Sequence, residues 1–301
     1  MRTSMEREKI RFGSGDVDCA AWHYPGSNGA CVVMAAGFGV TKEPGTDAFA
    51  RRFHEAGFGV LAFDHRNLGE SGGQPRQVLR IKDQLADWQA ATACAATLPG
   101  VDPARLAIWG FSSAGGHVLR VAARNPQVAA VIAQTPSIDG PATSRNAAQH
   151  QTPLAMLRLT GRGLADVVGR RLGRPPRLVP LAGRPGTVAV LTTPDAMDGL
   201  RAFEPDRRYP DWQQTAAAGS VLSLGFYRPG RDTPQIRCPL LVLVCDQDRS
   251  ALPETAVRAA GRAPRAEVVR LPGGHYAPFL ETHEQAVDAE LSFLRRHLLA
   301  I

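Results

Sequence analysis

The 301 residues carry a formal net charge of +7, with 21% of them charged and 44% hydrophobic. These proportions are typical of a soluble globular protein, and no run of about 18 uncharged apolar residues is present to span a membrane. The charged N-terminus, MRTSMEREKIRF, lacks the apolar stretch of a secretory signal, so we expect a cytoplasmic protein of one or two domains without a membrane partner.

The positive charge comes almost entirely from arginine. Lysine occurs only at positions 9, 42 and 82, so 32 of the 35 basic residues are arginines. They are spread along the chain apart from a denser stretch at 158–184, and no motif that alternates basic and aromatic residues accompanies them. The sequence therefore predicts no nucleic-acid partner.

Apolar strands alternate with amphipathic helices in the first part of the chain. KIRF and CAAWHY predict two antiparallel edge strands. Four later runs are apolar on both faces, as strands covered by helices on both sides should be: 30–36, 58–64, 105–110 and 128–134. Helical spacing links them, with Phe49, Phe53 and Ala56 in one segment and Ile81, Leu85 and Trp88 in the next. The series predicts an α/β fold, with a mostly parallel twisted sheet flanked by helices.

The alternation stops at residues 139–235. This segment holds Pro and Gly clusters, helical pieces around 154–168 and 212–224, and no comparable buried strand. We predict that it is a helical lid inserted into a core formed by 1–138 and 236–301.

Strands of the sheet resume after the insertion. They cover 239–245 and 266–271, and a final helix follows with apolar residues spaced along 287–298. A capping box of Thr282 and Gln285 is expected at its start. The five cysteines are at positions 19, 31, 94, 238 and 245. Because they lack C-x-x-C spacing, we expect them in the core rather than at a metal or redox site.

Two adjacent serines follow the third buried strand, in the stretch WGFSSAGG at 109–116. A serine on a sharp strand-to-helix turn presents its hydroxyl as a nucleophile only if the residues two before and two after it are small. Gly110 and Ala114 meet this condition for Ser112. Phe111 does not meet it for Ser113, so Ser112 is the predicted nucleophile.

A serine nucleophile needs a base and an acid that orients the base. His275 lies in the Gly-rich loop after the last strand, and Asp248 lies three residues past the end of the strand before it. Asp246 is the alternative acid, but its place directly after the strand favours bonding to turn amides. His117 is the alternative base, but it lies in the helix after Ser112, too close in sequence to fold back. The predicted catalytic residues are therefore Ser112, His275 and Asp248.

Acyl transfer also requires hydrogen-bond donors for the carbonyl oxygen as it becomes negative. We expect the backbone N–H groups of Phe38, after the turn at Gly37, and Ser113 to form this oxyanion hole. A phosphate-binding role for these glycines is disfavoured because no phosphate-loop motif is present.

The motifs AAGFGVTKE, FDHRNLGESGG, WGFSSAGGHVL, VCDQDRSALP and GGHYAPF together resemble the α/β-hydrolase superfamily. The resemblance covers nearly the whole chain and is strongest to dienelactone-hydrolase-like and peptidase-like serine hydrolases. It implies an α/β-hydrolase fold with Ser112, Asp248 and His275 in the chain order of that family. Two departures are visible: Ala36 stands before Gly37 where many relatives have His, and Ser112 replaces the cysteine nucleophile of dienelactone hydrolases proper.

The leading functional hypothesis is a serine hydrolase that cleaves an ester or thioester of a hydrophobic small molecule. An acyl-eliminating lyase or an acyltransferase that acts on a natural-product intermediate could use the same residues. A further alternative is a noncatalytic binding protein with the same fold. No metal or organic cofactor is implied. The expected partner is a small-molecule substrate, and a homodimer is left open.

The insertion is expected to select the substrate. It carries apolar residues such as Leu154 and Leu157, and we predict that Trp212, Phe226 and Tyr227 line a pocket over Ser112. Arginines of 158–184 should face outward.

Overall fold

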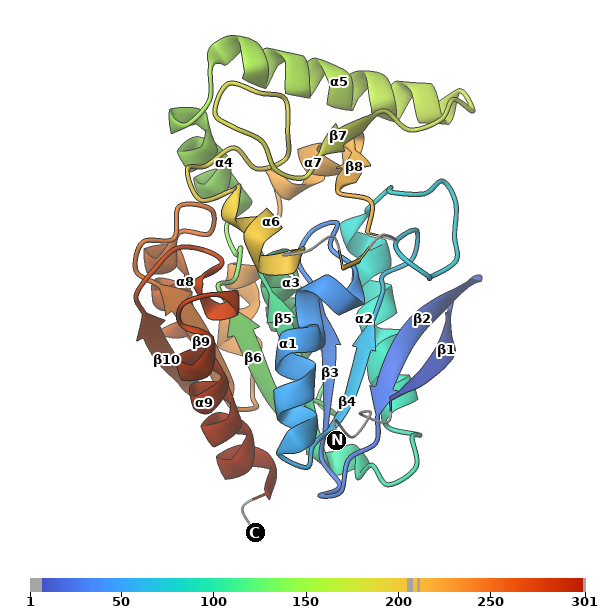
Figure 1. Ribbon diagram of the computed structural model, residues 1–301, viewed down its shortest axis with the longest axis vertical. Coiled ribbons are helices and arrows are strands. Elements are labelled where there is room, and N and C mark those ends of the chain that lie inside the picture. The colour runs from blue at the N-terminus through green and yellow to red at the C-terminus, as the bar shows by residue number, and fades with distance from the viewer. Residues whose placement is uncertain (1–6, 205–207, 210–211, 300–301) are drawn as a thin grey trace.

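The structure, a computed structural model, describes residues 7–204, 208–209 and 212–299. Within this part of the chain, an eight-stranded sheet lies at the centre of the molecule (Figure 1). Its spatial order is β1-β2-β4-β3-β5-β6-β9-β10. The strand bounds are β1 Glu8–Ser14, β2 Val17–Tyr24, β3 Cys31–Ala35, β4 Gly59–Phe63, β5 Leu106–Phe111, β6 Ala130–Gln134, β9 Leu240–Cys245 and β10 Ala266–Leu271.

The sheet is parallel from β4 to β10, and only its first edge is antiparallel. β1 pairs antiparallel with β2, and β2 pairs antiparallel with β4. All residues of β3, β4, β5, β6 and β9 are buried, because helices cover both faces. The predicted fold class is confirmed, including the antiparallel strands at the start.

Two sets of helices cover the sheet. Buried residues of α1 (Lys42–Glu55) and α9 (His283–Leu294) form the core on one face. Those of α2 (Ile81–Ala95), α3 (Ser113–Ala122) and α8 (Pro253–Ala260) form the core on the other. Short helices occur at η1 Pro103–Arg105, η3 Ala277–Phe279 and η4 Arg295–Leu299.

The predicted capping box at the start of the final helix is wrong. α9 does begin after Thr282, but no side-chain hydrogen bond caps the helix. The Thr282 hydroxyl is buried and has no partner among the described residues. Thr282 adopts φ −110° and ψ 20°, away from the extended backbone usual at an N-cap.

The insertion lies beyond one end of the sheet, with its longest helix, α5, farthest away (Figure 1). Its elements are α4 Gly140–Gln149, α5 Pro153–Arg171, β7 Leu178–Pro180, α6 Asp198–Phe203, β8 Thr215–Ala217, α7 Ala218–Leu224 and η2 Pro229–Gln235. β7 and β8 pair antiparallel, so the insertion has a small sheet that the sequence did not predict. The helix expected from Trp212 begins only at Ala218, because residues 215–217 are extended in this sheet.

Candidate active site

Ser112 occupies a sharp turn between β5 and α3. Its φ of 57° is left-handed, a conformation that serine adopts rarely and that turns its side chain out of the strand. Gly110 makes the close approach of strand and helix possible. A Cβ atom at Gly110 would lie 2.4 Å from the carbonyl oxygen of Ala114. The methyl group of Ala114 is accommodated in the core.

The structure brings together the three side chains that the sequence singled out. His275 Nε2 lies 3.0 Å from the Ser112 hydroxyl, and His275 Nδ1 lies 2.7 Å from Asp248 Oδ2. His275 and Asp248 are buried, whereas Ser112 is half-buried. A neutral imidazole protonated on Nδ1 can donate to Asp248 while Nε2 accepts the serine proton.

The electrostatic surroundings favour the protonated imidazole. Burial alone would lower the pKa of His275, but the carboxylates of Asp248 and Asp195 raise it above its ordinary value. The other oxygen of Asp248, Oδ1, accepts hydrogen bonds from the backbone N–H groups of Ser250, at 2.8 Å, and Ala251, at 2.7 Å. These donors fix the carboxylate so that it faces the imidazole.

The alternative acid, Asp246, lies elsewhere. Its side chain is on the surface, where Oδ1 accepts a hydrogen bond from Arg270 at 2.8 Å. The expectation that Asp246 bonds turn amides is wrong, because Asp248 accepts those bonds instead. The structure therefore places Asp248, and not Asp246, beside the imidazole.

The alternative base, His117, is buried in α3. It contacts the Tyr227 hydroxyl through Nδ1 at 3.0 Å and Gln84 Oε1 through Nε2 at 3.3 Å. Burial, followed by the positive charge of neighbouring groups, lowers the pKa of His117 to about 3. It is thus a neutral core residue that holds α3 to the insertion.

The two expected oxyanion-hole amides come from different parts of the chain: Ser113 follows Ser112 directly, and Phe38 belongs to the loop after β3. A Cβ atom at Gly37 would lie 3.3 Å from Ser112 Cβ, so the loop carrying Phe38 passes close beside the serine. Ser113 is the first residue of α3, where backbone N–H groups lack acceptors within the helix. Neither the Phe38 nor the Ser113 amide donates to another described residue. Both are free to bind a ligand oxygen.

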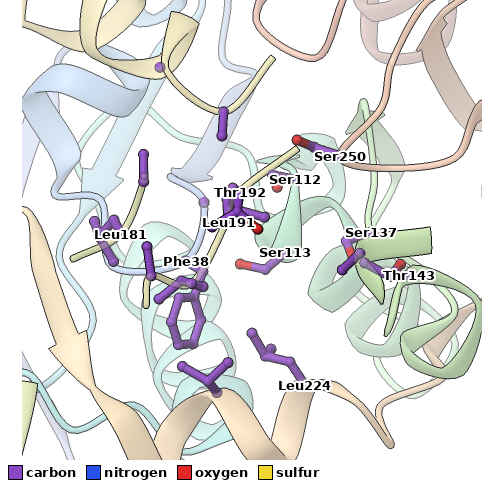
Figure 2. A pocket seen from close by; sticks show the side chains of 18 of the residues that line it. Phe38, Ser112, Ser113, Ser137, Thr143, Leu181, Leu191, Thr192, Leu224 and Ser250 are labelled. Carbon is purple, nitrogen blue, oxygen red and sulfur yellow. The ribbon is translucent and has the colours of Figure 1, made fainter. Parts of the chain in front are cut away.

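A cavity of about 630 Å³ lies between the insertion and the ends of the strands. Ser112 lines this cavity. Phe38 and Leu181 lie to one side of it, and Ser137 and Thr143 lie to the other (Figure 2). Most of the lining is apolar. Among the residues that the structure describes, no Asp, Glu, Lys or Arg side chain lines this cavity.

The three residues expected in the pocket all border the cavity, but in different ways. Trp212 is buried, and its indole N–H donates to the Gly39 carbonyl at 3.0 Å. Tyr227 is buried against His117. Phe226 is 85% exposed and stands at the rim.

Part of the apolar surface of the insertion does not cover Ser112, contrary to expectation. Leu154 and Leu157 are 54% and 69% exposed on α5, beside the exposed Arg158 and Arg162. α5 packs on α7, and its small residues take the contact: Gly163 lies against Leu222. Leu154 and Leu157 therefore face outward, whereas Met156 and Leu159 of the same helix line the cavity.

Sequence reasoning missed Asp195, a buried carboxylate of the insertion that lies beside the candidate site. It lies in the stretch TTPDAMDG and reaches both loops that carry Asp248 and His275. No pattern in the sequence distinguishes it from Asp198 three residues later, which is only half-buried.

The part of the chain that the structure describes contains no group of three His, Cys, Asp or Glu side chains arranged to hold a metal ion. No helix in it is long and apolar enough to cross a membrane.

Comparisons with known proteins agree with this architecture. The model of the alpha/beta hydrolase family matches residues 32–289. The quorum-quenching protein AidA of Acinetobacter baumannii is 41% identical over 292 residues, which cover 95% of this chain and 94% of AidA. The thiohydrolase aneE of Aspergillus aculeatus is 30% identical over 233 residues, covering 74% of this chain and 70% of aneE.

A third relative, GrgF of Penicillium sp., is named a polyketide transferase and is 27% identical over 188 residues, covering 62% of this chain and 61% of GrgF. The crystal structure of GrgF, described there as an alpha/beta hydrolase, superposes with a TM-score of 0.81 over 98% of this chain and 100% of GrgF, at 22% identity.

Proposed function

Because the chain belongs to the α/β-hydrolase family, we propose that it is a serine hydrolase that cleaves an ester or thioester of an uncharged, hydrophobic small molecule. The observation that carries the proposal is the chain of contacts from Ser112 through His275 to Asp248, at 3.0 and 2.7 Å, at the wall of an apolar cavity. The thiohydrolase among the relatives supports including thioesters.

In the first half of the reaction, His275 Nε2 takes the Ser112 proton while the serine oxygen attacks the carbonyl carbon. The carbonyl oxygen becomes negative, and the N–H groups of Phe38 and Ser113 stabilise it. The bond to the leaving alcohol or thiol then breaks, and the leaving group takes the proton from His275. The acyl group remains bound to Ser112.

In the second half, a water molecule gives a proton to His275 and attacks the acyl carbonyl. The free acid leaves, and the proton returns from His275 to the Ser112 oxygen. Asp248 stays ionised throughout and stabilises the imidazolium that forms in each half. No step requires a metal or an organic cofactor.

The lining of the cavity argues for the class of substrate. A buried charge without a partner costs several kcal/mol, and the described lining offers no charged side chain to pair with one. Aromatic and aliphatic side chains favour an apolar acyl chain, whereas Ser137 and Thr143 offer hydrogen bonds to uncharged polar groups. The relative named for quorum quenching makes a bacterial signal molecule of this kind the first substrate to test.

Acyl transfer is the second candidate, because GrgF is named a polyketide transferase. A transferase would give the Ser112-bound acyl group to an alcohol or amine in the cavity instead of water. A lyase would use His275 to remove a carbon-bound proton while the acyloxy group on the neighbouring carbon leaves as a carboxylate, which gives an alkene.

The products decide among these reactions. Purified protein would be incubated with a series of uncharged acyl esters and thioesters of increasing chain length, with and without acceptor alcohols, and the products identified by mass spectrometry. We expect free acid and alcohol or thiol. A new ester as the main product would establish transfer, an alkene would establish elimination, and no turnover of any ester would contradict catalysis.

A further inference from the structure

Asp195 is a buried carboxylate of the insertion, and the reaction steps above do not use it. Only 7% of its surface is exposed. A carboxylate in such a place must be compensated by hydrogen bonds or by a positive charge. Its surroundings show which groups compensate it.

The donors come from two loops of the core. The backbone N–H of Arg249 donates to Asp195 Oδ2 at 2.8 Å, and the Ser250 hydroxyl donates to Oδ1 at 2.9 Å. The backbone N–H of His275 makes a longer contact with Oδ2, at 3.4 Å. One side chain of the insertion thus contacts both loops that carry the predicted base and acid.

Ser250 is held between two carboxylates. Its backbone N–H donates to Asp248, and its hydroxyl donates to Asp195. The hydroxyl of Thr193, another residue of the insertion, lies 2.7 Å from the same Ser250 oxygen. The position of the Asp248 loop is therefore fixed from the insertion as well as from β9.

The charge of Asp195 acts on the imidazole. Burial on its own would raise the pKa of Asp195, but His275 and the hydrogen-bond donors lower it below its ordinary value, so the group is an anion at neutral pH. The charged groups that act on His275 are Asp248 and Asp195, and the neighbouring Tyr276 is neutral because burial raises its pKa.

We propose that Asp195 is a positioning residue, through which the insertion holds the Asp248 and His275 loops in place and stabilises the imidazolium. The proposal rests on the proposed function, because it assigns Asp195 to the same Ser112, His275 and Asp248. It makes the insertion a part of the catalytic apparatus as well as a wall of the pocket.

The test measures how fast a fluorophosphonate labels Ser112 as the pH is varied, because this reaction needs the base but not the natural substrate. The midpoint of the acidic limb reports the pKa of His275. In Asp195→Asn we expect labelling to slow by about 10- to 100-fold at neutral pH, as for a small misplacement of reacting groups. We also expect the midpoint to move to lower pH, because one of two negative charges is lost.

Asp198→Asn is the matched control. Asp198 begins α6 in the same segment and pairs at the surface with Arg201, so its labelling rate and midpoint should match wild type within about twofold. If Asp195→Asn does not fold, Asp195→Glu carries the test. It keeps the charge but adds a methylene, so we expect slower labelling with the midpoint at the wild-type pH.

The outcomes are distinct. The proposal is overturned if the Asp195→Asn protein labels at the wild-type rate. It is also overturned if that protein labels more slowly but keeps the wild-type midpoint, because Asp195 then does not stabilise the imidazolium. An Asp195→Glu protein that labels at the wild-type rate overturns it as well. A wild-type protein that does not label at Ser112 overturns the proposed function itself.

Discussion

Ser112 is held in a strained conformation by bonds to three segments. A non-glycine residue at φ 57° costs on the order of 1–3 kcal/mol, which the neighbouring structure must offset. Its N–H donates to the Gln134 carbonyl at 3.0 Å, and its carbonyl accepts from the N–H groups of Gly116, at 3.1 Å, and Ser137, at 2.9 Å. The serine oxygen is therefore presented to His275 by a fixed backbone.

Asp248→Asn should lower kcat by roughly 10⁴-fold if the residue acts as its serine-protease counterpart does, because the amide would favour the wrong imidazole tautomer. Asp246→Asn is the control. Its exposed pair with Arg270 is worth about 0–1 kcal/mol at most, so turnover and melting temperature should change little. Steady-state kinetics of both variants check this, and a crippled Asp246→Asn would reverse the assignment.

The pH dependence of wild-type kcat/KM follows from the raised pKa of His275. The base must be neutral to accept the serine proton, so activity is lost as the pH falls through the pKa of the folded protein. Because that pKa lies above the ordinary value of 6.5, we expect the acidic midpoint above pH 6.5. A midpoint below pH 6.5 would show that burial outweighs the two carboxylates.

At the scale of elements, the turn from β5 to α3 determines where the chemistry lies. The strand ends at Phe111 and the helix begins at Ser113, leaving only Ser112 between them. The positive N-terminal end of α3 begins directly after Ser112, so in the proposed reaction it would stabilise the oxygen that becomes negative there. This turn depends on Gly110, where no Cβ atom fits.

Gly110→Ala should separate β5 from α3, because the added methyl would lie 2.4 Å from a backbone oxygen that cannot give way cheaply. We expect a loss of at least about 100-fold in kcat/KM from misplacement of Ser112, together with a lower melting temperature. Ala114→Gly is the matched change on the other side of Ser112, and it should stay within a few-fold of wild type. Equal activity of all three proteins would refute the steric argument.

The sequence predicted some elements far better than others. The strands β3, β4, β5, β6 and β9 were recognisable because both of their faces are buried, which leaves an uninterrupted apolar run. β7 and β8 were missed because each has only three residues, and α6 has only six. Such short elements are determined by tertiary contacts and leave no periodic pattern.

The candidate site shows the same difference. Ser112, Asp248 and His275 follow strands, so their side-by-side placement could be inferred from the order of parallel strands. Asp195 could not, because its place depends on how the insertion folds back on the core. Phe226 was expected to line the pocket and does border the cavity, but no local signal in the sequence indicated that its side chain would be 85% exposed.

At the scale of the whole molecule, the core supplies the predicted chemistry and the insertion supplies most of the cavity wall. The cavity is lined from the core by residues such as Phe38 and Phe111, and from the insertion by residues such as Leu181, Phe203 and Trp212. Substitutions of the insertion residues that line the cavity should therefore change which substrate reacts rather than whether a small ester reacts.

Trp212→Ala removes a buried side chain from the wall of the cavity. We therefore expect the ratio of kcat/KM for a long and a short acyl ester to change by about tenfold or more, which is the discrimination that one or two methylene groups give in an apolar pocket. Phe226→Ala, at the exposed rim, should change this ratio by less than about threefold. Measuring both esters with each variant tests the idea. An unchanged ratio in Trp212→Ala, with only a lower melting temperature, would show that the indole merely packs the insertion onto the core.

The central claim, that Ser112 is the nucleophile, is tested most directly by mapping a covalent adduct. The protein would be treated with a fluorophosphonate, digested with trypsin, and the peptide 106–120 sequenced by mass spectrometry, since it contains both Ser112 and Ser113. We expect the full adduct mass on Ser112 and no adduct on Ser113. The Ser112→Ala protein should carry no adduct, and its turnover should fall by about 10⁶-fold. An adduct on Ser113 or on another residue, or ester turnover that survives in Ser112→Ala, would contradict this claim.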